Sequence, residues 1–259
     1  LNLADSVYPV IEQSGIDLYT VKSLIRESSG VKSNKYHPVI LFDSSKPALD
    51  IASVESQLEL KVQHIIRPNI DDIYIPNIQE PEFERERRYH GQFRSLAREI
   101  GGCRVGLALS SGAAKGLAHI GVIQILEENG IYVDAIAGSS IGAYVGACWA
   151  RGYNGKEMEL LSKSYEKKAG IFDLVDPSFP PRRGVIRGRK VESRLRHILN
   201  NAKFEDLSYP LKVTAVNLST LEPHLFTEGD VATAVRASCS IPGISVPRII
   251  DGQSYIDGG

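Results

Sequence analysis

The chain has 259 residues, of which 42% are hydrophobic, 24% charged and 7% aromatic. This length and composition exclude a disordered, collagen-like or low-complexity chain. They predict one large domain or two ordinary ones, with cores that need no metal or disulfide. Thirty basic and 31 acidic residues give a net charge of −1, which excludes a globally basic nucleic-acid-binding protein.

The three cysteines lie far apart in the sequence and form no C-x-x-C pair. The sequence therefore predicts neither a zinc site nor a disulfide framework, and it favours a reducing compartment. The first residue is Leu1 and the only methionine is Met158, so we expect the natural start of the protein to lie upstream.

The first hundred residues alternate loosely between apolar runs and helical patterns. These patterns predict buried strands at residues 38–42 and 62–66 and helices over residues 51–60 and 82–100. Residues 69–81 are rich in Pro, Asn and Asp and predict an irregular linker. Gly101 and Gly102 end the second helix, so we divide the chain into residues 1–102, an α/β or linker region of unknown role, and residues 103–259. A nucleotide-sensing role for the first part is disfavoured because it contains no phosphate-binding loop.

The second part has a sharper pattern, with predicted strands at residues 104–109, 131–137 and 211–216 and helices at residues 117–128 and 141–150. Alternating strands, glycine turns and helices predict an α/β fold with a mainly parallel sheet. Residues 131–150 contain a single charge, Asp134, and resemble a membrane span in length. Glycines and serines at residues 138–142 interrupt this segment, which favours a strand, a turn and a helix instead.

Residues 138–142 have the form G-x-S-x-G and lie between a predicted strand and a predicted helix. This motif places a serine on a sharp turn at the end of a strand, where side chains on either flank would clash. The amino terminus of the following helix favours negative charge that develops at the serine. Ser140 is therefore a candidate nucleophile. The alternative is a plain glycine-rich connection between a strand and a helix.

Residues 110–116 form a loop of small residues about thirty positions before Ser140. Such a loop can turn several backbone N–H groups toward one point and form an oxyanion hole. It is neither a phosphate-binding P-loop, because Lys115 precedes Gly116, nor a G-x-G-x-x-G dinucleotide fingerprint. A tight turn that binds no ligand is the alternative. Asp257 ends an apolar run and precedes two glycines, a pattern that alone indicates a hairpin turn.

The order of these motifs resembles that of the patatin-like phospholipases. In that family a glycine-rich loop is followed by H-x-G-V, G-x-S-x-G, A-S-x-x-I-P-G and D-G-G. The corresponding motifs here occupy residues 112–116, 119–122, 138–142, 237–243 and 257–259. The resemblance covers about residues 104–259 and points to the branch of bacterial patatin-like proteins and neuropathy target esterase. It implies a three-layer α/β/α domain with a mainly parallel central sheet, and we expect part of this domain to follow Gly259.

The resemblance also implies a function: serine-dependent hydrolysis of carboxylic esters in phospholipids or lysophospholipids. The sequence itself contains neither a cluster of carboxylates and histidines nor a calcium-binding loop, so we expect no metal ion and no cofactor. The resemblance implies a Ser–Asp dyad in which Ser140 is the nucleophile and Asp257 the base, and an oxyanion hole from Ser111, Gly112 and Ala113. The partner implied is a lipid rather than a nucleic acid. The location implied is the cytoplasm or the periphery of a membrane. Further motif residues are Lys115, Gly116, Gly138, Gly142, Gly258 and Gly259.

One departure from the family pattern and several other residues leave alternatives open. Ser110 and Ser111 replace two glycines of the family loop, which favours as a second hypothesis a catalytically impaired lipid-binding or regulatory domain. The chain order Ser140, Asp206, His224 matches the triad of ordinary α/β-hydrolases, although His224 lies where a turn leads into a predicted edge strand. His119, Cys148 and Cys239 are predicted to be packing residues. The basic residues of the run at 182–190 predict a solvated loop or a contact with anionic headgroups; they are Arg182, Arg183, Arg187, Arg189 and Lys190.

Overall fold

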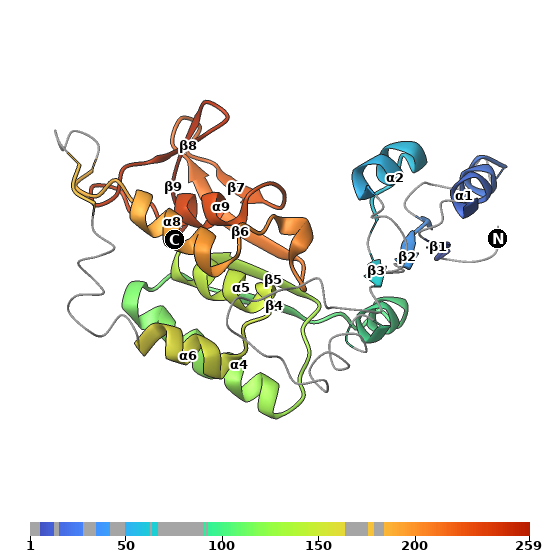
Figure 1. The fold of residues 1–259 in the computed structure, drawn as a ribbon, viewed down its shortest axis with the longest axis horizontal. Helices are drawn as coiled ribbons and strands as arrows, with labels where there is room; N and C mark the ends of the chain where they lie inside the picture. Colours follow the sequence, from blue (N-terminus) through green and yellow to red (C-terminus); the bar gives the residue numbers. More distant parts are fainter. Residues whose placement is uncertain are drawn as a thin grey trace. The chain divides into compact units, whose positions relative to one another are not determined.

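A computed structural model describes residues 6–12, 16–27, 35–41, 50–62, 64–66, 91, 93–163, 176–178 and 184–259. The chain forms two compact units, Leu1–Cys103 and Arg104–Gly259 (Figure 1). The linker predicted at residues 69–81, most of residues 82–92, and Arg182 and Arg183 lie outside the described residues.

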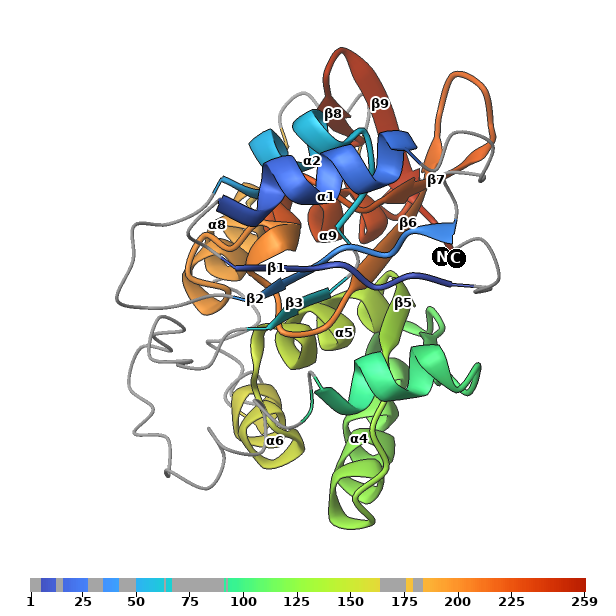
Figure 2. The same ribbon diagram turned by 90° about the vertical axis from the view of Figure 1, so that its right-hand side faces the viewer.

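The first unit contains a three-stranded parallel sheet in the order β1-β2-β3, formed by Val10–Glu12, Val39–Leu41 and His64–Ile66 (Figure 2). Helices α1 (Ile16–Glu27) and α2 (Ile51–Leu58) follow the first two strands. The two strands and the helix predicted in this region are confirmed, and residues 93–100 are helical as well. Apolar side chains from both layers make the core of the unit, which consists of Ile11, Val21, Ile40, Val54 and Leu58.

The second unit is built on a six-stranded sheet of mixed direction. Strands β4 (Gly106–Leu109), β5 (Ala135–Ser139) and β6 (Leu211–Asn217) are parallel neighbours. Strands β7 (Pro223–Phe226), β9 (Gln253–Asp257) and β8 (Arg248–Ile250) are antiparallel additions, of which β7 and β9 pair with β6 and β8 pairs with β9. The α/β class with a parallel central sheet is confirmed, and the residues around His224 do form the strand that was expected there.

The registers show that β5 and β9 share one edge of β6. Val213 in β6 pairs with both Gly138 and Phe226, so β5 and β7 lie on opposite edges of β6. Ala215 pairs with both His224 and Asp257, so β9 also lies opposite β7. Strand β5 is parallel to β6 and β9 is antiparallel to it. Their carboxyl ends therefore meet, where Ser139 pairs with Thr214 and Asp257 with Ala215.

Helices pack on the sheet at this meeting point. Helix α5 (Ile141–Arg151) approaches the face formed by Leu109, Ile136 and Leu211, which surround its Gly146. Helix α9 (Val231–Ser238) packs beside α5 against β6 and β9. Among the described residues, this unit also contains helices α4 (Ala118–Glu128), α6 (Gly155–Lys163) and α8 (Arg189–Ile198) and the 3₁₀ turns η3 (Ala113–Leu117) and η4 (Phe204–Asp206).

The segment 131–150 forms strand β5, a turn and helix α5, as predicted from its glycines and serines. With only 11 residues, α5 is much shorter than the ~20 residues that cross a bilayer. Across the described ranges, no helix has both the length and the apolar character of a membrane span.

Candidate active site

Ser140 lies on the sharp turn between β5 and α5 and is 6% exposed. Its backbone adopts φ 54° and ψ −122°, a positive φ that non-glycine residues rarely adopt outside functional turns. A Cβ at Gly138 would lie 2.6 Å from the Cα of Ala143, and one at Gly142 would overlap the carbonyl oxygen of Leu109. The flanking glycines are therefore required because the strand, the turn and the helix approach one another closely.

The hydroxyl of Ser140 donates a hydrogen bond to Oδ2 of Asp257 over 2.6 Å. The other carboxylate oxygen of Asp257, Oδ1, accepts from the backbone N–H of Gly259 over 2.8 Å. A Cβ at Gly258 would overlap the carbonyl oxygen of Thr214, and one at Gly259 would overlap the side chain of Ser111. The two glycines thus let the chain pass close to β6 and to the loop at residues 110–116, with both carboxylate oxygens of Asp257 held.

Residues 110–115 of the loop are exposed, and the loop lies beside this pair. Gly112 and Ala113 begin the 3₁₀ turn η3, and Ala113 has a positive φ of 47°. The imidazole Nε2 of His119 is 2.9 Å from the carbonyl oxygen of Ser110, so His119 contacts the loop. Gly116 is buried where a Cβ would overlap Ile141, the residue that follows Ser140.

The end of helix α9 supplies two contacts that the sequence did not predict. The hydroxyl of Ser238 accepts a hydrogen bond from the backbone N–H of Ser140 over 2.8 Å and donates to the carbonyl oxygen of Thr214 over 2.6 Å. The carbonyl oxygen of Ser240 accepts from the backbone N–H of Asp257 over 2.9 Å. Both serines belong to the A-S-x-x-I-P-G motif at residues 237–243, but the motif by itself did not indicate that either serine contacts the dyad.

Arg236 precedes these serines by two and four residues and has a buried guanidinium, with 3% of the residue's surface exposed. Its Nε donates to the carbonyl of Gly188, its Nη2 to those of Arg187 and Val246, and its Nη1 to the hydroxyl of Ser240. Burial lowers the pKa of Arg236 below its ordinary value, and nearby Cys239 and Glu192 oppose this shift. No property of the sequence had indicated this residue.

Cys239 lies between Ser238, the last residue of α9, and Ser240, and its thiol contacts the side chain of Ser140. Burial raises the pKa of Cys239 to about 12, and the negative charge of Asp257 adds to the shift. Burial also raises the pKa of Cys148 to about 12. Both thiols are therefore protonated at neutral pH, which agrees with their predicted role in packing and disfavours either as a nucleophile.

The Ser140–Asp206–His224 triad is not assembled. Asp257, not an imidazole, receives the hydrogen bond of Ser140. The ring of His224 packs instead against Phe226 and Tyr255, with ring centroids 4.5 and 5.1 Å apart. The carboxylate of Asp206 accepts a hydrogen bond from the backbone N–H of Lys203 at the start of η4.

Within the described part of the chain, no cluster of three or more His, Cys, Asp and Glu residues is arranged to hold a metal ion.

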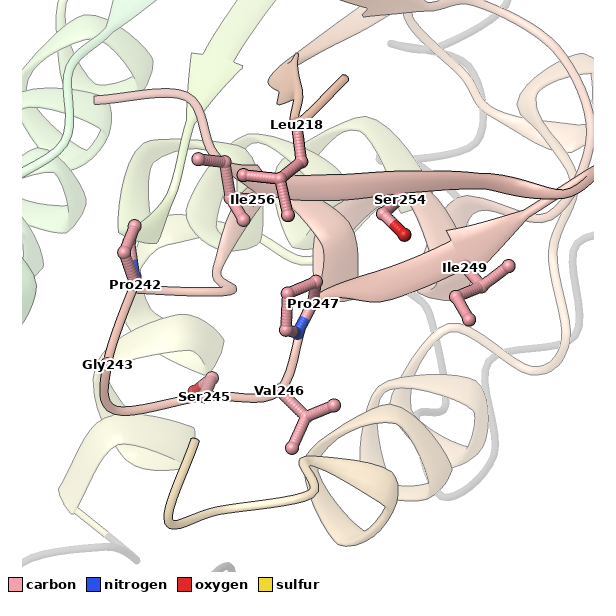
Figure 3. Close-up of a pocket in the computed structure, with 9 residues that line it drawn as sticks. All are labelled: Leu218, Pro242, Gly243, Ser245, Val246, Pro247, Ile249, Ser254 and Ile256. Carbon is pink, nitrogen blue, oxygen red and sulfur yellow. The ribbon is translucent and has the colours of Figure 1, made fainter. Parts of the chain in front are cut away.

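A pocket of about 450 Å³ lies between the loop that follows Ser240 and the β8–β9 hairpin (Figure 3). Its side chains are uncharged and mostly apolar, and Ile256 contributes to it directly before Asp257. Successive residues of a strand point to opposite faces, so the pocket lies on the other face of β9 from the Asp257 carboxylate. The remaining lining residues are Leu218, Pro242, Gly243, Ser245, Val246, Pro247, Ile249 and Ser254.

The sequence model of the patatin-like phospholipases matches residues 107–259, which include the whole of this site. The chain belongs to the patatin-like phospholipase family. An uncharacterized NTE family protein of Mycobacterium tuberculosis is 40% identical over 156 residues, which are 60% of this chain and 42% of that protein. The lysophospholipase nte1 of Aspergillus fumigatus is 33% identical over 186 residues, 70% of this chain and 12% of that protein. This patatin-like chain thus spans less than half the length of these curated relatives.

Among solved structures, VipD from Legionella pneumophila is similar to this chain with a TM-score of 0.49 and 19% identity. The match covers 60% of this chain and 46% of the VipD chain. ExoU from Pseudomonas aeruginosa, in its complex with SpcU, is similar with a TM-score of 0.38 and 18% identity. This match covers 52% of this chain and 38% of the ExoU chain.

Proposed function

We propose that this patatin-like protein is a serine-dependent hydrolase of lipid carboxylic esters that acts through a Ser140–Asp257 dyad. The observation that carries the proposal is the 2.6 Å hydrogen bond from the Ser140 hydroxyl, on its strained turn, to the Asp257 carboxylate. Membership of the phospholipase family supports the reaction class. Relatives that are named lysophospholipases support phospholipids or lysophospholipids as the substrate class.

In the proposed acylation step, Asp257 takes the proton of Ser140 while Oγ attacks the ester carbonyl. The proton then passes to the leaving alcohol, and an acyl group remains on Ser140. Water activated by Asp257 hydrolyses this acyl-enzyme and regenerates the serine. A carboxylate is a weak base for a hydroxyl, so the reaction needs a well-made Ser–Asp hydrogen bond together with strong stabilisation of the oxyanion.

We assign the oxyanion hole to the backbone N–H groups of Ser111, Gly112 and Ala113. Ser111 lies so close to Gly259 that a Cβ at Gly259 would overlap its side chain. This closeness supports the assignment, because Gly259 is bonded through its backbone N–H to the carboxylate of Asp257. The amino terminus of α5 begins at Ser140 and favours the same negative charge. The proposed mechanism uses neither a metal ion nor a cofactor.

Access to lipid is proposed to involve peripheral contact with a membrane surface. Ile241 and Ile244, in the loop after Ser240, are 37% and 47% exposed, and nearby Leu218 is 43% exposed. Exposed apolar side chains close to the dyad suit an interface with acyl chains. Arg187, Arg189 and Lys190 are exposed as well and suit anionic headgroups.

A catalytically impaired lipid-binding domain is the second candidate function. It is favoured by Ser110 and Ser111, which replace glycines of the family loop and place a side chain against Gly259. Reaction with a fluorophosphonate separates the two candidates, because only an activated serine is labelled by it.

The decisive experiment measures fluorophosphonate labelling and hydrolysis of a lysophospholipid by the wild type and by Ser140→Ala. We expect the substitution to abolish both activities, because it removes the attacking atom. Ser139→Ala is the matched control, since Ser139 lies in the same turn but makes no hydrogen bond to the dyad. A properly folded wild type that neither labels nor hydrolyses, or labelling that persists in Ser140→Ala, would contradict the proposal.

A further inference from the structure

The carboxyl end of helix α9 contacts both members of the proposed dyad. Ser238 and Ser240 have no exposed surface. Ser238 is the last residue of the helix, and Ser240 follows it after Cys239. One serine contacts the backbone of Ser140 and the other contacts the backbone of Asp257. Two residues that are 117 positions apart in the sequence are therefore anchored to a single short segment.

Ser238 is oriented by two hydrogen bonds. Its hydroxyl hydrogen goes to the carbonyl of Thr214, so a lone pair is left to accept the N–H of Ser140. Thr214 lies in β6 directly opposite Ser139. Ser238 thus ties the strained turn to the sheet on which the turn stands. Because the hydroxyl is buried and its hydrogen is committed to Thr214, Ser238 is not placed to touch a substrate.

Ser240 is fixed in turn by Arg236. The guanidinium donates to the Ser240 hydroxyl, which itself donates to the backbone carbonyl of Arg236. Three backbone carbonyls from the segments around residues 187 and 246 hold the remaining donors of Arg236. The carbonyl of Ser240 can then hold the N–H of Asp257 in a defined place.

We infer that residues 236–240 are a positioning element for the dyad. Ser238 fixes the backbone position of the nucleophile Ser140, and Ser240, which is held by Arg236, fixes the backbone position of the acid Asp257. This inference rests on the proposed hydrolase function. The element makes the Ser140–Asp257 distance depend on one rigid segment instead of on two independent strand ends. Displacement of a reacting group by ~1 Å can lower a rate about 100-fold, so loss of either contact reduces kcat more than it alters KM.

The test compares Ser238→Ala with Ser208→Ala in the full-length protein. Ser208 is a suitable control because its hydroxyl is also buried but has no hydrogen-bond partner. We expect Ser238→Ala to lower kcat for a short-chain soluble ester by about 10- to 100-fold with KM changed less than 2-fold. Rates are expressed per serine that reacts with fluorophosphonate, which removes the effect of an unfolded fraction. Ser238→Thr keeps the hydroxyl and is expected to recover most of the lost kcat.

Hydrogen–deuterium exchange of the segment 138–144 gives a readout that does not depend on activity. Ser238→Ala is expected to speed exchange of the Ser140 amide, whereas Ser208→Ala leaves it unchanged. If the wild type is inactive, the proposed hydrolase function fails, and the exchange result alone decides whether Ser238 holds the turn. Unchanged kcat and unchanged exchange in Ser238→Ala overturn the inference.

A second variant covers the case in which Ser238→Ala does not fold. Arg236→Lys keeps the positive charge but cannot hold Ser240 and three carbonyls together. We expect it to lower kcat at least 10-fold at unchanged KM and to speed exchange around Asp257. An Arg236→Lys protein with wild-type kcat and wild-type exchange shows that the acid is positioned without Arg236, and this result refutes the inference for the acid.

Discussion

The carboxylate of Asp257 accepts a hydrogen bond from the hydroxyl of Ser140 because strands β5 and β9 meet end to end on one edge of β6. A parallel strand and an antiparallel strand point their carboxyl ends at each other in this arrangement. The two residues therefore come together without an intervening imidazole, and the register of β6 decides their separation.

The identity of the base can be tested with Asp257→Asn, which keeps the shape of the side chain but removes its charge. General-base assistance contributes about 10²- to 10⁴-fold, so we expect kcat for ester hydrolysis to fall by at least that order. His224→Ala should change kcat little, because its ring packs with Phe226 and Tyr255. Steady-state kinetics of both variants check this ranking, and the reverse ranking would favour a histidine-containing triad.

The pH profile provides an independent check on the base. An acting base must be deprotonated, so activity declines as the pH falls through its pKa. Carboxylates ordinarily titrate below pH 5 and imidazoles near pH 6.5. We therefore expect kcat/KM to be flat between about pH 6 and 8. A decline from pH 8 to pH 6 would indicate an imidazole base.

The requirement for glycine in the turn at residues 138–142 can be tested by measuring thermal stability and fluorophosphonate labelling together. In Gly142→Ala the new Cβ would overlap the carbonyl oxygen of Leu109, so we expect a lower Tm and loss of fluorophosphonate labelling. Gly121→Ala is the matched control, because Gly121 lies in helix α4 with nothing within 4 Å of a new Cβ. There the better helix propensity of alanine should increase the free energy of unfolding by about 0.5–1 kcal/mol. Equal Tm values for the two variants would show that the turn relaxes readily.

The raised pKa of Cys239 predicts slow alkylation. With a pKa of about 12, only ~10⁻⁴ of the thiol is ionised at pH 8, and the thiolate is the reactive form. Treatment of the native protein with iodoacetamide at pH 8 should therefore modify the exposed Cys103 well before Cys239 or Cys148. Peptide mass spectrometry measures the order. Modification of Cys239 at the rate of Cys103 would contradict the assignment of a partly buried, protonated thiol.

Hydrolysis through a Ser–Asp dyad needs no divalent metal ion. We expect activity on a lysophospholipid to be unchanged in an excess of EDTA. A loss of activity that calcium alone restores would require a different mechanism, and magnesium serves as the control for non-specific ionic effects on the lipid.

The sequence predicted the residues whose role depends on local turn chemistry. Ser140 and Asp257 lie beside glycines that permit close backbone approach, and this requirement is visible within a few residues. The contacts of Ser238 and Arg236 arise from the packing of α9 against β6 and β9, which joins segments far apart in the chain. Periodicity carries no information on such contacts. The strand that ends at Asp257 was expected from its apolar run, whereas β8 was missed, since a strand of three residues gives a weak pattern.

The end-to-end meeting of β5 and β9 also has a consequence for synthesis of the protein on the ribosome. The turn that carries Ser140 is translated 117 residues before Asp257. At about 5–20 residues per second, Asp257 is added roughly 6–23 s after Ser140. During that interval Ser140 lacks its hydrogen-bond partner, so the proposed dyad forms only when β9 pairs with β6.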